Sequence, residues 1–293
     1  MYLDGFIEYL RTEKRRSSNT QEAYRRDYLN FEEYMKAKNI YDLKDVSNTE
    51  IVSYLYKLKD EGKSAATVNR KLASLRALYT YLKKEGIVSR DPTEGIKSPR
   101  VGRKEIEYLT IEEVNSLLML PDDSVKGKRD KAILELLYAT GIRVNELVAT
   151  DVEDINLRIG FYTCNGDAGK ARIIPIGKPA RKAVEDYIFN SRDILLRENE
   201  DEKALFVNYY GGRMTRQGLW KLLKAYGDKA GLGDKLTPHT LRNSFAVHML
   251  QNGADLKSLQ ELMGHEDLTA TQIYLSVTRH RIKDVYDRTH PRA

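Results

Sequence analysis

The sequence has a single cysteine, seven prolines and one tryptophan, and no stretch approaches the roughly 18 apolar residues that a membrane span needs. The lone Cys164 excludes an intrachain disulfide and a zinc site built on cysteines, and it fits a reducing compartment. We expect its side chain to be a small buried group in a strand. The first residues are amphipathic rather than basic and then apolar, as a signal peptide would be. We therefore expect a cytoplasmic protein without a membrane partner.

Excess charge of one sign is small overall and absent from the second part of the chain. The 293 residues carry 49 lysines and arginines and 43 aspartates and glutamates, a net charge of +6. Residues 1–106 hold 22 basic and 16 acidic side chains, whereas residues 107–293 hold 27 of each. This asymmetry suggests that the first part grips a polyanion and the second does something more specific. A solvated basic surface is the alternative.

The first ninety residues have the apolar spacing of four helices. Apolar side chains recur every three or four positions in residues 6–10, 24–35, 51–58 and 68–82. Side chains suited to N-caps precede three of these runs: Ser18, Asn48 and Ser64. In the last run Arg70 and Lys71 are candidates for contact with phosphates. We therefore expect a helical domain over residues 1–90, to which the resemblance described below assigns DNA binding.

Residues 91–107 combine prolines, glycines and basic side chains without a helical period, which is typical of a linker. Residues 108–293 then form the second expected domain. Thr110 and Glu113 have the spacing of a capping box, and residues 129–139 predict a buried helix. The period changes to that of strands at residues 160–164 and 172–176, which predict a β-hairpin, and residues 205–208 predict a third strand. From residue 215 the chain is again helical.

Several polar side chains stand in apolar surroundings in this second part. Arg143 follows a glycine turn after the buried helix. Thr237 and Pro238 begin a helix that places His239 and Arg242 on one face. His265 follows another glycine, and Tyr274 comes nine residues later.

Two arginines, two histidines and a tyrosine are the groups that phosphoryl transfer from a DNA backbone requires. Guanidiniums bind the non-bridging phosphate oxygens, on which charge accumulates. A tyrosine hydroxyl attacks phosphorus once its proton is removed, and the covalent product conserves the bond energy. Histidines transfer that proton and donate to phosphate. We expect no cofactor and no metal, because the sequence lacks the clustered carboxylates of a metal nuclease.

The motifs ATGIRVNEL, HTLRNSFAVHML and LMGHEDLTATQIYLSV, in this order, resemble the tyrosine recombinase, or phage integrase, family. Within it the chain is most similar to the Xer site-specific recombinases of bacteria, over almost its whole length. The resemblance implies a mainly α fold: a four-helix SAM-like core-binding domain, and a mostly α catalytic domain with a small antiparallel β-sheet.

By the same resemblance Arg143, His239, Arg242 and His265 are catalytic and Tyr274 is the nucleophile. The enzyme would cleave and rejoin double-stranded DNA through a 3′-phosphotyrosine. It would act as a tetramer on two DNA sites, with or without a second related recombinase. The Xer role would be chromosome dimer resolution, which serves chromosome partition and cell division.

Two positions depart from the family pattern. The family carries a catalytic lysine in the turn of the β-hairpin, where this chain has Asp167. An ionised aspartate repels phosphate and cannot protonate the leaving oxygen. We expect Lys170, three residues further along the turn, to supply this proton, although contact with the DNA backbone alone is the alternative. Asn243 stands where many relatives have histidine.

Other functions remain open on the sequence. A DNA integrase or transposase of a mobile element would use the same chemistry. A type IB topoisomerase shares the chemistry but relaxes DNA without pairing sites. Loss of the lysine at Asp167 also leaves open a DNA-binding protein with impaired cleavage.

Overall fold

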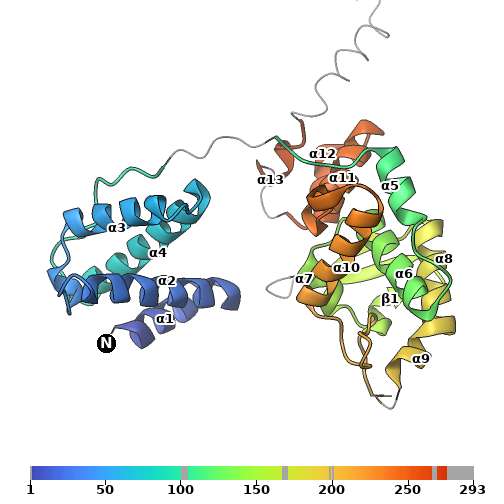
Figure 1. The fold of residues 1–293 in the computed structure, drawn as a ribbon, viewed down its shortest axis with the longest axis horizontal. Helices are drawn as coiled ribbons and strands as arrows, with labels where there is room; N and C mark the ends of the chain where they lie inside the picture. The colour runs from blue at the N-terminus through green and yellow to red at the C-terminus, as the bar shows by residue number, and fades with distance from the viewer. Residues whose placement is uncertain are drawn as a thin grey trace, which may run out of the picture. The chain divides into compact units, whose positions relative to one another are not determined.

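The computed structural model describes residues 2–99, 105–166, 171–197, 199, 201–265 and 269–275. The chain divides into two units, residues 1–104 and 105–293 (Figure 1). Most described residues are helical, and the strands are few and short, which confirms the predicted mainly α class. The finer boundaries expected at residues 90 and 107 stay predictions. Among the helices that the structure describes, none is long and apolar enough to cross a membrane.

The described part of the first unit contains the four α-helices that the apolar spacing predicts. They are α1 (Leu3–Thr12), α2 (Ser18–Lys36), α3 (Asn48–Asp60) and α4 (Ala65–Lys84), with a 3-10 turn, η1 (Leu43–Asp45), before α3. Ser64 caps α4 as predicted, whereas Ser17 and Ser47 cap α2 and α3, one residue before the expected positions. In each cap a serine hydroxyl accepts a hydrogen bond from a backbone amide of the first turn.

Lys71 is not available to phosphates, contrary to the expectation from sequence. Its side chain is only 7% exposed, and its Nζ lies 3.1 Å from Oδ1 of the buried Asp27. Asp27 also pairs with Arg70, whose side chain is 45% exposed. A buried carboxylate needs such partners to offset the loss of its hydration. Lys71 therefore stabilises the helical core, and Arg70 remains the candidate for phosphate contact.

The second unit combines nine described helices with a small sheet, one face of which is exposed. The helices are α5 (Ile111–Leu118), α6 (Val125–Thr140), α7 (Val144–Ala149), α8 (Lys178–Tyr187), α9 (Asp193–Leu196), α10 (Arg216–Lys229), α11 (Pro238–Gln251), α12 (Leu256–Met263) and α13 (Thr269–Gln272). Shorter helical turns are η2 (Val152–Asp154), the π-turn η4 (Ile188–Arg192) and η5 (Gly233–Lys235). The capping box of Thr110 and Glu113 forms as predicted, and Thr237 caps α11 with Pro238 in its first turn.

Helix α6 is the centre of this unit. Its residues 132–137 are all buried, so the second half of the helix is covered on every side. It packs against α8, α11 and α5. The helix ends at Gly141, which adopts the left-handed conformation with a φ of +58°. This turn directs the chain into Arg143 and α7.

The described strands form one antiparallel sheet in the order β1 (Ile155–Asn156), β2 (Phe161–Asn165) and β3 (Ala171–Pro175). The predicted hairpin is β2 and β3, in a register that places Tyr162 opposite Ile174 and Cys164 opposite Arg172. Cys164 is fully buried, as expected. The prediction of a third strand at residues 205–208 was wrong: this stretch contributes one isolated bridge, between Val207 and Arg213, and the third strand is β1.

The turn at Gly141 yields the first testable prediction. A Cβ at this position would lie 2.3 Å from Cδ1 of Phe245 on α11, and the left-handed backbone disfavours any side chain. Gly141→Ala should therefore lower the free energy of unfolding by about 2–4 kcal/mol, combining backbone strain with overpacking. Urea titration followed by the fluorescence of the only tryptophan, Trp220 on α10, measures this value.

Gly231→Ala is the matched control, because Gly231 also has a positive φ, of +69°, but a Cβ there would have open space around it. Its cost should be limited to backbone strain of about 1–2 kcal/mol. Equal costs for the two variants would contradict a steric role for the contact between Gly141 and Phe245.

Candidate active site

The site is organised around the C-terminal end of α12. The last carbonyls of a helix lack partners inside the helix and carry partial negative charge. Here the amides of Gly264 and His265 turn back to bond the carbonyls of Glu261 and Gln260, because Gly264 is left-handed with a φ of +62°. The next three carbonyls, of residues 262–264, remain directed outward.

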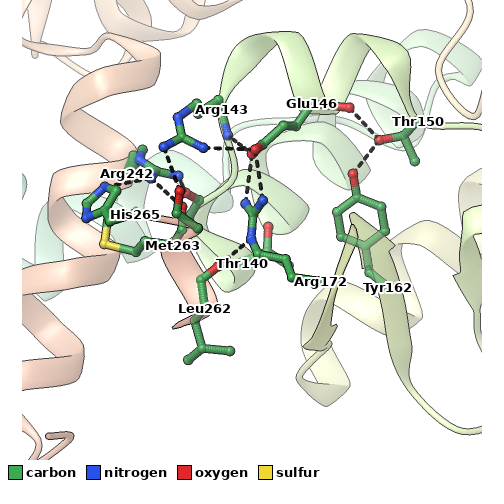
Figure 2. A network of polar contacts seen from close by, with 12 residues as sticks. Thr140, Arg143, Glu146, Thr150, Tyr162, Arg172, Arg242, Leu262, Met263 and His265 are labelled. Atoms are coloured by element: carbon green, nitrogen blue, oxygen red, sulfur yellow. Dashed lines mark hydrogen bonds and ion pairs between the residues drawn. The ribbon is translucent and has the colours of Figure 1, made fainter. Parts of the chain in front are cut away.

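Three arginines from three different elements each donate to one of these carbonyls (Figure 2). Arg172 of β3 donates from Nε to the Leu262 carbonyl at 2.8 Å. Arg242 of α11 donates to the Met263 carbonyl at 2.7 Å, and Arg143, just before α7, donates to the Gly264 carbonyl at 3.0 Å. The end of α12 thus draws together residues from distant parts of the sequence.

Glu146 is the anion of this cluster. Its carboxylate accepts two hydrogen bonds from Arg172, at 2.9 and 2.8 Å, and two from Arg143: one from the guanidinium at 3.0 Å and one from the backbone amide at 2.7 Å. Burial raises the pKa of Glu146, but the hydrogen bonds from Arg172 and Arg143 outweigh it and bring the pKa to about 2. Glu146 is therefore ionised at neutral pH.

The guanidiniums outnumber the carboxylate. Among the described side chains of this cluster, Arg143 and Arg172 share the carboxylate of Glu146. Arg242 instead donates to the backbone carbonyls of Gly141 and Met263. Burial lowers the pKa of Arg242 to about 10, and the charge of Arg143 acts in the same direction, but Arg242 still remains protonated at neutral pH. The side chain of Arg143 is 40% exposed. The cluster therefore carries unbalanced positive charge beside an accessible guanidinium, which suits an anion such as phosphate.

The protonation state of His265 follows from its partners. Its Nε2 lies 2.9 Å from Nη2 of Arg242, and its Nδ1 lies 2.9 Å from Oγ1 of Thr271. A guanidinium can only donate, so Nε2 is the acceptor and Nδ1 carries the proton. Burial, followed by the charges of Arg242 and Arg143, lowers the pKa of His265 to about 4. The imidazole is thus neutral at pH 7, with its basic nitrogen directed at Arg242.

Tyr274 lies beside this cluster and is almost completely covered. The side chain is 2% exposed and packs with Phe245, Leu259 and Met263. Its hydroxyl donates to Oδ1 of Asn243 at 3.0 Å. Burial raises the pKa of the Tyr274 phenol, although the nearby charges of Arg242 and Arg143 oppose this effect. The phenol is therefore protonated in this structure.

The structure thus brings together four of the side chains that the sequence singles out: Arg143, Arg242, His265 and Tyr274. His239 is exposed on the first turn of α11, whereas Arg242, one turn later, is buried. The expectation that both point at one target stays a prediction. Lys170 and Asp167 lie outside the described residues.

Two members of the cluster were not singled out from the sequence, although each left a signal. Glu146 stands three residues after Arg143 at the start of a helix, which is the spacing of a capping box. The half that Glu146 supplies forms, since its carboxylate accepts the Arg143 backbone amide, whereas a guanidinium cannot accept the return bond. Arg172 and Ile174 of β3 pair with Cys164 and Tyr162 of β2, so all four side chains lie on the same, buried face of the sheet. A charged side chain at an inward position of a strand indicates a buried partner.

The chain is similar to known proteins over almost its whole length. The model of the phage integrase family matches residues 107–281, and that of the phage integrase N-terminal SAM-like domain matches residues 3–86. Tyrosine recombinase XerD of Oceanobacillus iheyensis is 46% identical over 292 residues, covering 99% of this chain and 98% of the relative. Tyrosine recombinase XerD of Listeria monocytogenes is 43% identical over 293 residues, covering 99% of both chains.

Solved structures share the fold. The XerH recombinase bound to palindromic difH substrate superposes with a TM-score of 0.76 at 23% identity, over 97% of this chain and 82% of that one. A lambda integrase dimer bound to a core site gives 0.69 at 19% identity, over 93% of each chain. The XerA recombinase is 26% identical with a TM-score of 0.56, over 100% of this chain and 99% of that one.

The contacts of Glu146 yield a prediction about stability and pH. The depressed folded-state pKa means that the ionised carboxylate stabilises the folded protein above the unfolded pKa, near 4.5, and that this contribution disappears as the pH falls toward 2. Glu146→Gln should lower the free energy of unfolding by about 3 kcal/mol at pH 7. The difference between the two proteins should shrink by more than half at pH 3, when both are measured by urea titration.

Glu153→Gln, at an exposed position of η2, is the control and should change the free energy of unfolding by less than about 0.5 kcal/mol. A deficit of Glu146→Gln that has the same size at pH 7 and pH 3 would show that its charge does not stabilise the fold.

Proposed function

Since this chain belongs to the phage integrase family and is a site-specific tyrosine recombinase of the Xer type, we propose that the cluster at the end of α12 cleaves double-stranded DNA, with Tyr274 as the nucleophile. The observation that carries this proposal is the convergence of Arg143, Arg242 and His265 at one helix end, with Tyr274 beside them. Arg143 and Arg242 would bind the non-bridging oxygens of the attacked phosphate, on which negative charge builds up.

The reaction that we propose exchanges one phosphoester bond for another. The Tyr274 oxygen forms a bond to phosphorus, and the bond from phosphorus to the 5′ oxygen breaks, which leaves a 3′-phosphotyrosine and a free 5′ hydroxyl. The phenol proton goes to a neutral acceptor, for which His265 Nε2 is available once Arg242 turns to phosphate. Exposed His239 would donate to the phosphate. Rejoining reverses these steps, so the exchange requires no nucleotide cofactor.

The leaving 5′ oxygen needs a proton, and we propose Lys170 as its source. An aspartate at position 167 is an acceptor at neutral pH and cannot fill this role. Residues 166–170, between β2 and β3 in the sequence, read GDAGK, and Lys170 is the cation among them. This assignment rests on sequence and chemistry alone.

We further propose that the two units divide the work on DNA. The basic excess of residues 1–106 supports a role in gripping the phosphate backbone, and the neutral second unit performs the chemistry. XerH and lambda integrase are relatives in fold that were solved with DNA. From the family resemblance of the sequence motifs, we also propose that the enzyme acts as a tetramer on two DNA sites, with or without a second related recombinase. The likeness to XerD favours chromosome dimer resolution over service to a mobile element.

The nucleophile is tested with Tyr274→Phe, which removes only the hydroxyl. On a nicked duplex that carries the target site, the unmodified protein should form an adduct that survives denaturant, and Tyr274→Phe should form none while binding the DNA equally well. The target site itself is found by trapping covalent complexes on host DNA and sequencing the attached ends.

Tyr210→Phe is the matched control, because Tyr210 is an exposed tyrosine of the same unit outside the cluster. It should keep the full adduct yield. An undiminished adduct with Tyr274→Phe would rule out Tyr274 as the nucleophile.

Lys170→Ala tests the general acid. Cleavage of the normal substrate should slow about 100- to 10,000-fold. A substrate with sulfur in place of the 5′ leaving oxygen needs little protonation, so Lys170→Ala should cleave it nearly as fast as the unmodified protein does. Rates come from single-turnover adduct formation on both substrates.

Lys178→Ala, at an exposed lysine in the first turn of α8, should leave both rates unchanged. If Lys170→Ala is equally slow on both substrates, Lys170 only positions the DNA, and the acid is another group.

A further inference from the structure

Asn243 lies between the nucleophile and the segment through which the chain enters the second unit. Its side chain is 5% exposed. The amide Nδ2 donates to the backbone carbonyl of Glu107 at 2.9 Å, and Oδ1 accepts the hydroxyl of Tyr274 at 3.0 Å. Asn243 is adjacent to Arg242 on α11 but makes no part of the arginine cluster described above. Nothing in the proposed chemistry uses it.

The Glu107 carbonyl determines which way this amide points. A carbonyl oxygen can only accept, so the Asn243 end that faces it must be the NH2 group. The opposite orientation would place two oxygens against each other at Glu107. Oδ1 therefore faces Tyr274, and the phenol has to donate to it. The backbone at Glu107, the third residue of the second unit, thus determines where the Tyr274 proton lies.

This contact opposes the attack on phosphorus in two ways. An acceptor bonded to the neutral phenol stabilises the protonated form over the phenolate, and an amide cannot take the proton away. The contact also keeps Tyr274 buried, since its side chain is 2% exposed and packed among Phe245, Leu259 and Met263. The phosphorus of a DNA phosphate cannot reach the hydroxyl there, so Tyr274 has to leave Asn243 before it reacts.

We propose that Asn243 is a positioning residue that holds Tyr274 in a buried resting position, and that release of this hydrogen bond precedes DNA cleavage. The inference rests on the proposed function, because it takes Tyr274 as the nucleophile. It goes beyond that function by assigning a residue outside the reacting groups to the control of when the nucleophile becomes available.

The neighbouring Ser244 provides a matched control. It is fully buried on the same helix, and its Oγ accepts a hydrogen bond from the Leu109 amide at 2.8 Å, so it ties α11 to the same incoming segment. Its hydroxyl also donates to the Thr240 carbonyl at 2.7 Å. Both residues thus anchor residues 107–109, but of the two only Asn243 has a hydrogen bond to Tyr274 among the described contacts. Ser244→Ala therefore loosens the segment without touching the nucleophile.

Nitration by tetranitromethane measures whether Tyr274 is held. The full-length protein is treated without DNA, and the rate at each tyrosine is read by peptide mass spectrometry. Exposed Tyr210 and buried Tyr79 serve as internal references. Asn243→Ala should raise nitration of Tyr274 several-fold with no change at Tyr210 or Tyr79, whereas Ser244→Ala should leave all three rates unchanged. Unchanged nitration of Tyr274 in Asn243→Ala, or an equal rise in Ser244→Ala, would overturn the proposal.

Single-turnover cleavage measures whether this hold delays the reaction. Asn243→Ala should form the adduct about five-fold faster, the change that corresponds to one ordinary buried hydrogen bond. Ser244→Ala should cleave at the unmodified rate. Faster nitration combined with slower cleavage in Asn243→Ala would also overturn the proposal, because the bond would then support the attacking position rather than a resting one.

Asn243→His keeps the test informative if Asn243→Ala folds poorly. A neutral imidazole has one donor for the Glu107 carbonyl and one acceptor for the Tyr274 hydroxyl, so this variant should retain slow nitration and the unmodified cleavage rate. If Tyr274 in Asn243→His is nitrated as fast as in thermally unfolded protein, the hydrogen bond is not the cause of its protection. Nitration is measured without DNA, so it tests the resting contact separately from the proposed nucleophile. If Asn243 protects Tyr274 from nitration but Tyr274→Phe still forms the DNA adduct, the proposed nucleophile is rejected and the resting contact is not.

Discussion

The active site depends on the buried carboxylate of Glu146. Without it, the guanidiniums of Arg143 and Arg172 would meet beside Arg242 with only backbone carbonyls as partners. Glu146 occupies the third position of α7, where the helix N-terminus favours negative charge, and it also caps the amide of Arg143. One side chain thus neutralises two arginines and orients the helix that carries one of them. Breaking such a buried pair typically costs about 3–5 kcal/mol.

The same arrangement prepares the site for phosphate. Glu146 holds the guanidiniums of Arg143 and Arg172, and backbone carbonyls hold that of Arg242, which leaves a positive surplus that is fixed before DNA arrives. Such preorganised charge stabilises a transition state without reorganisation at the moment of reaction. His265 is neutral because burial and this positive surplus both lower its pKa. Tyr274 is protonated because burial raises the pKa of its phenol, although the surplus acts in the opposite direction. Reactive groups are therefore kept close together but chemically at rest.

Several features were predictable from the sequence because they depend on neighbouring residues. The four N-terminal helices, the capping box at Thr110 and the hairpin of β2 and β3 follow from local period and caps. The prediction of a third strand at residues 205–208 was wrong because residues 204–207 are all buried. A short buried run has the same composition whether or not it pairs with a strand. The prediction that Lys71 contacts phosphates was wrong because its partner, the carboxylate of Asp27, is distant in the sequence.

The sequence by itself determined the family, the mainly α class and the segments that carry Arg143, Arg242, His265 and Tyr274, since ordered motifs and local spacing are properties of the chain alone. Only the tertiary structure decided what these residues touch. The ties between Arg172 and Glu146 and between Asn243 and Tyr274 join residues that are 26 and 31 positions apart. Orientation, burial and protonation state depend on such distant partners, because each is determined by the groups that replace water around a side chain.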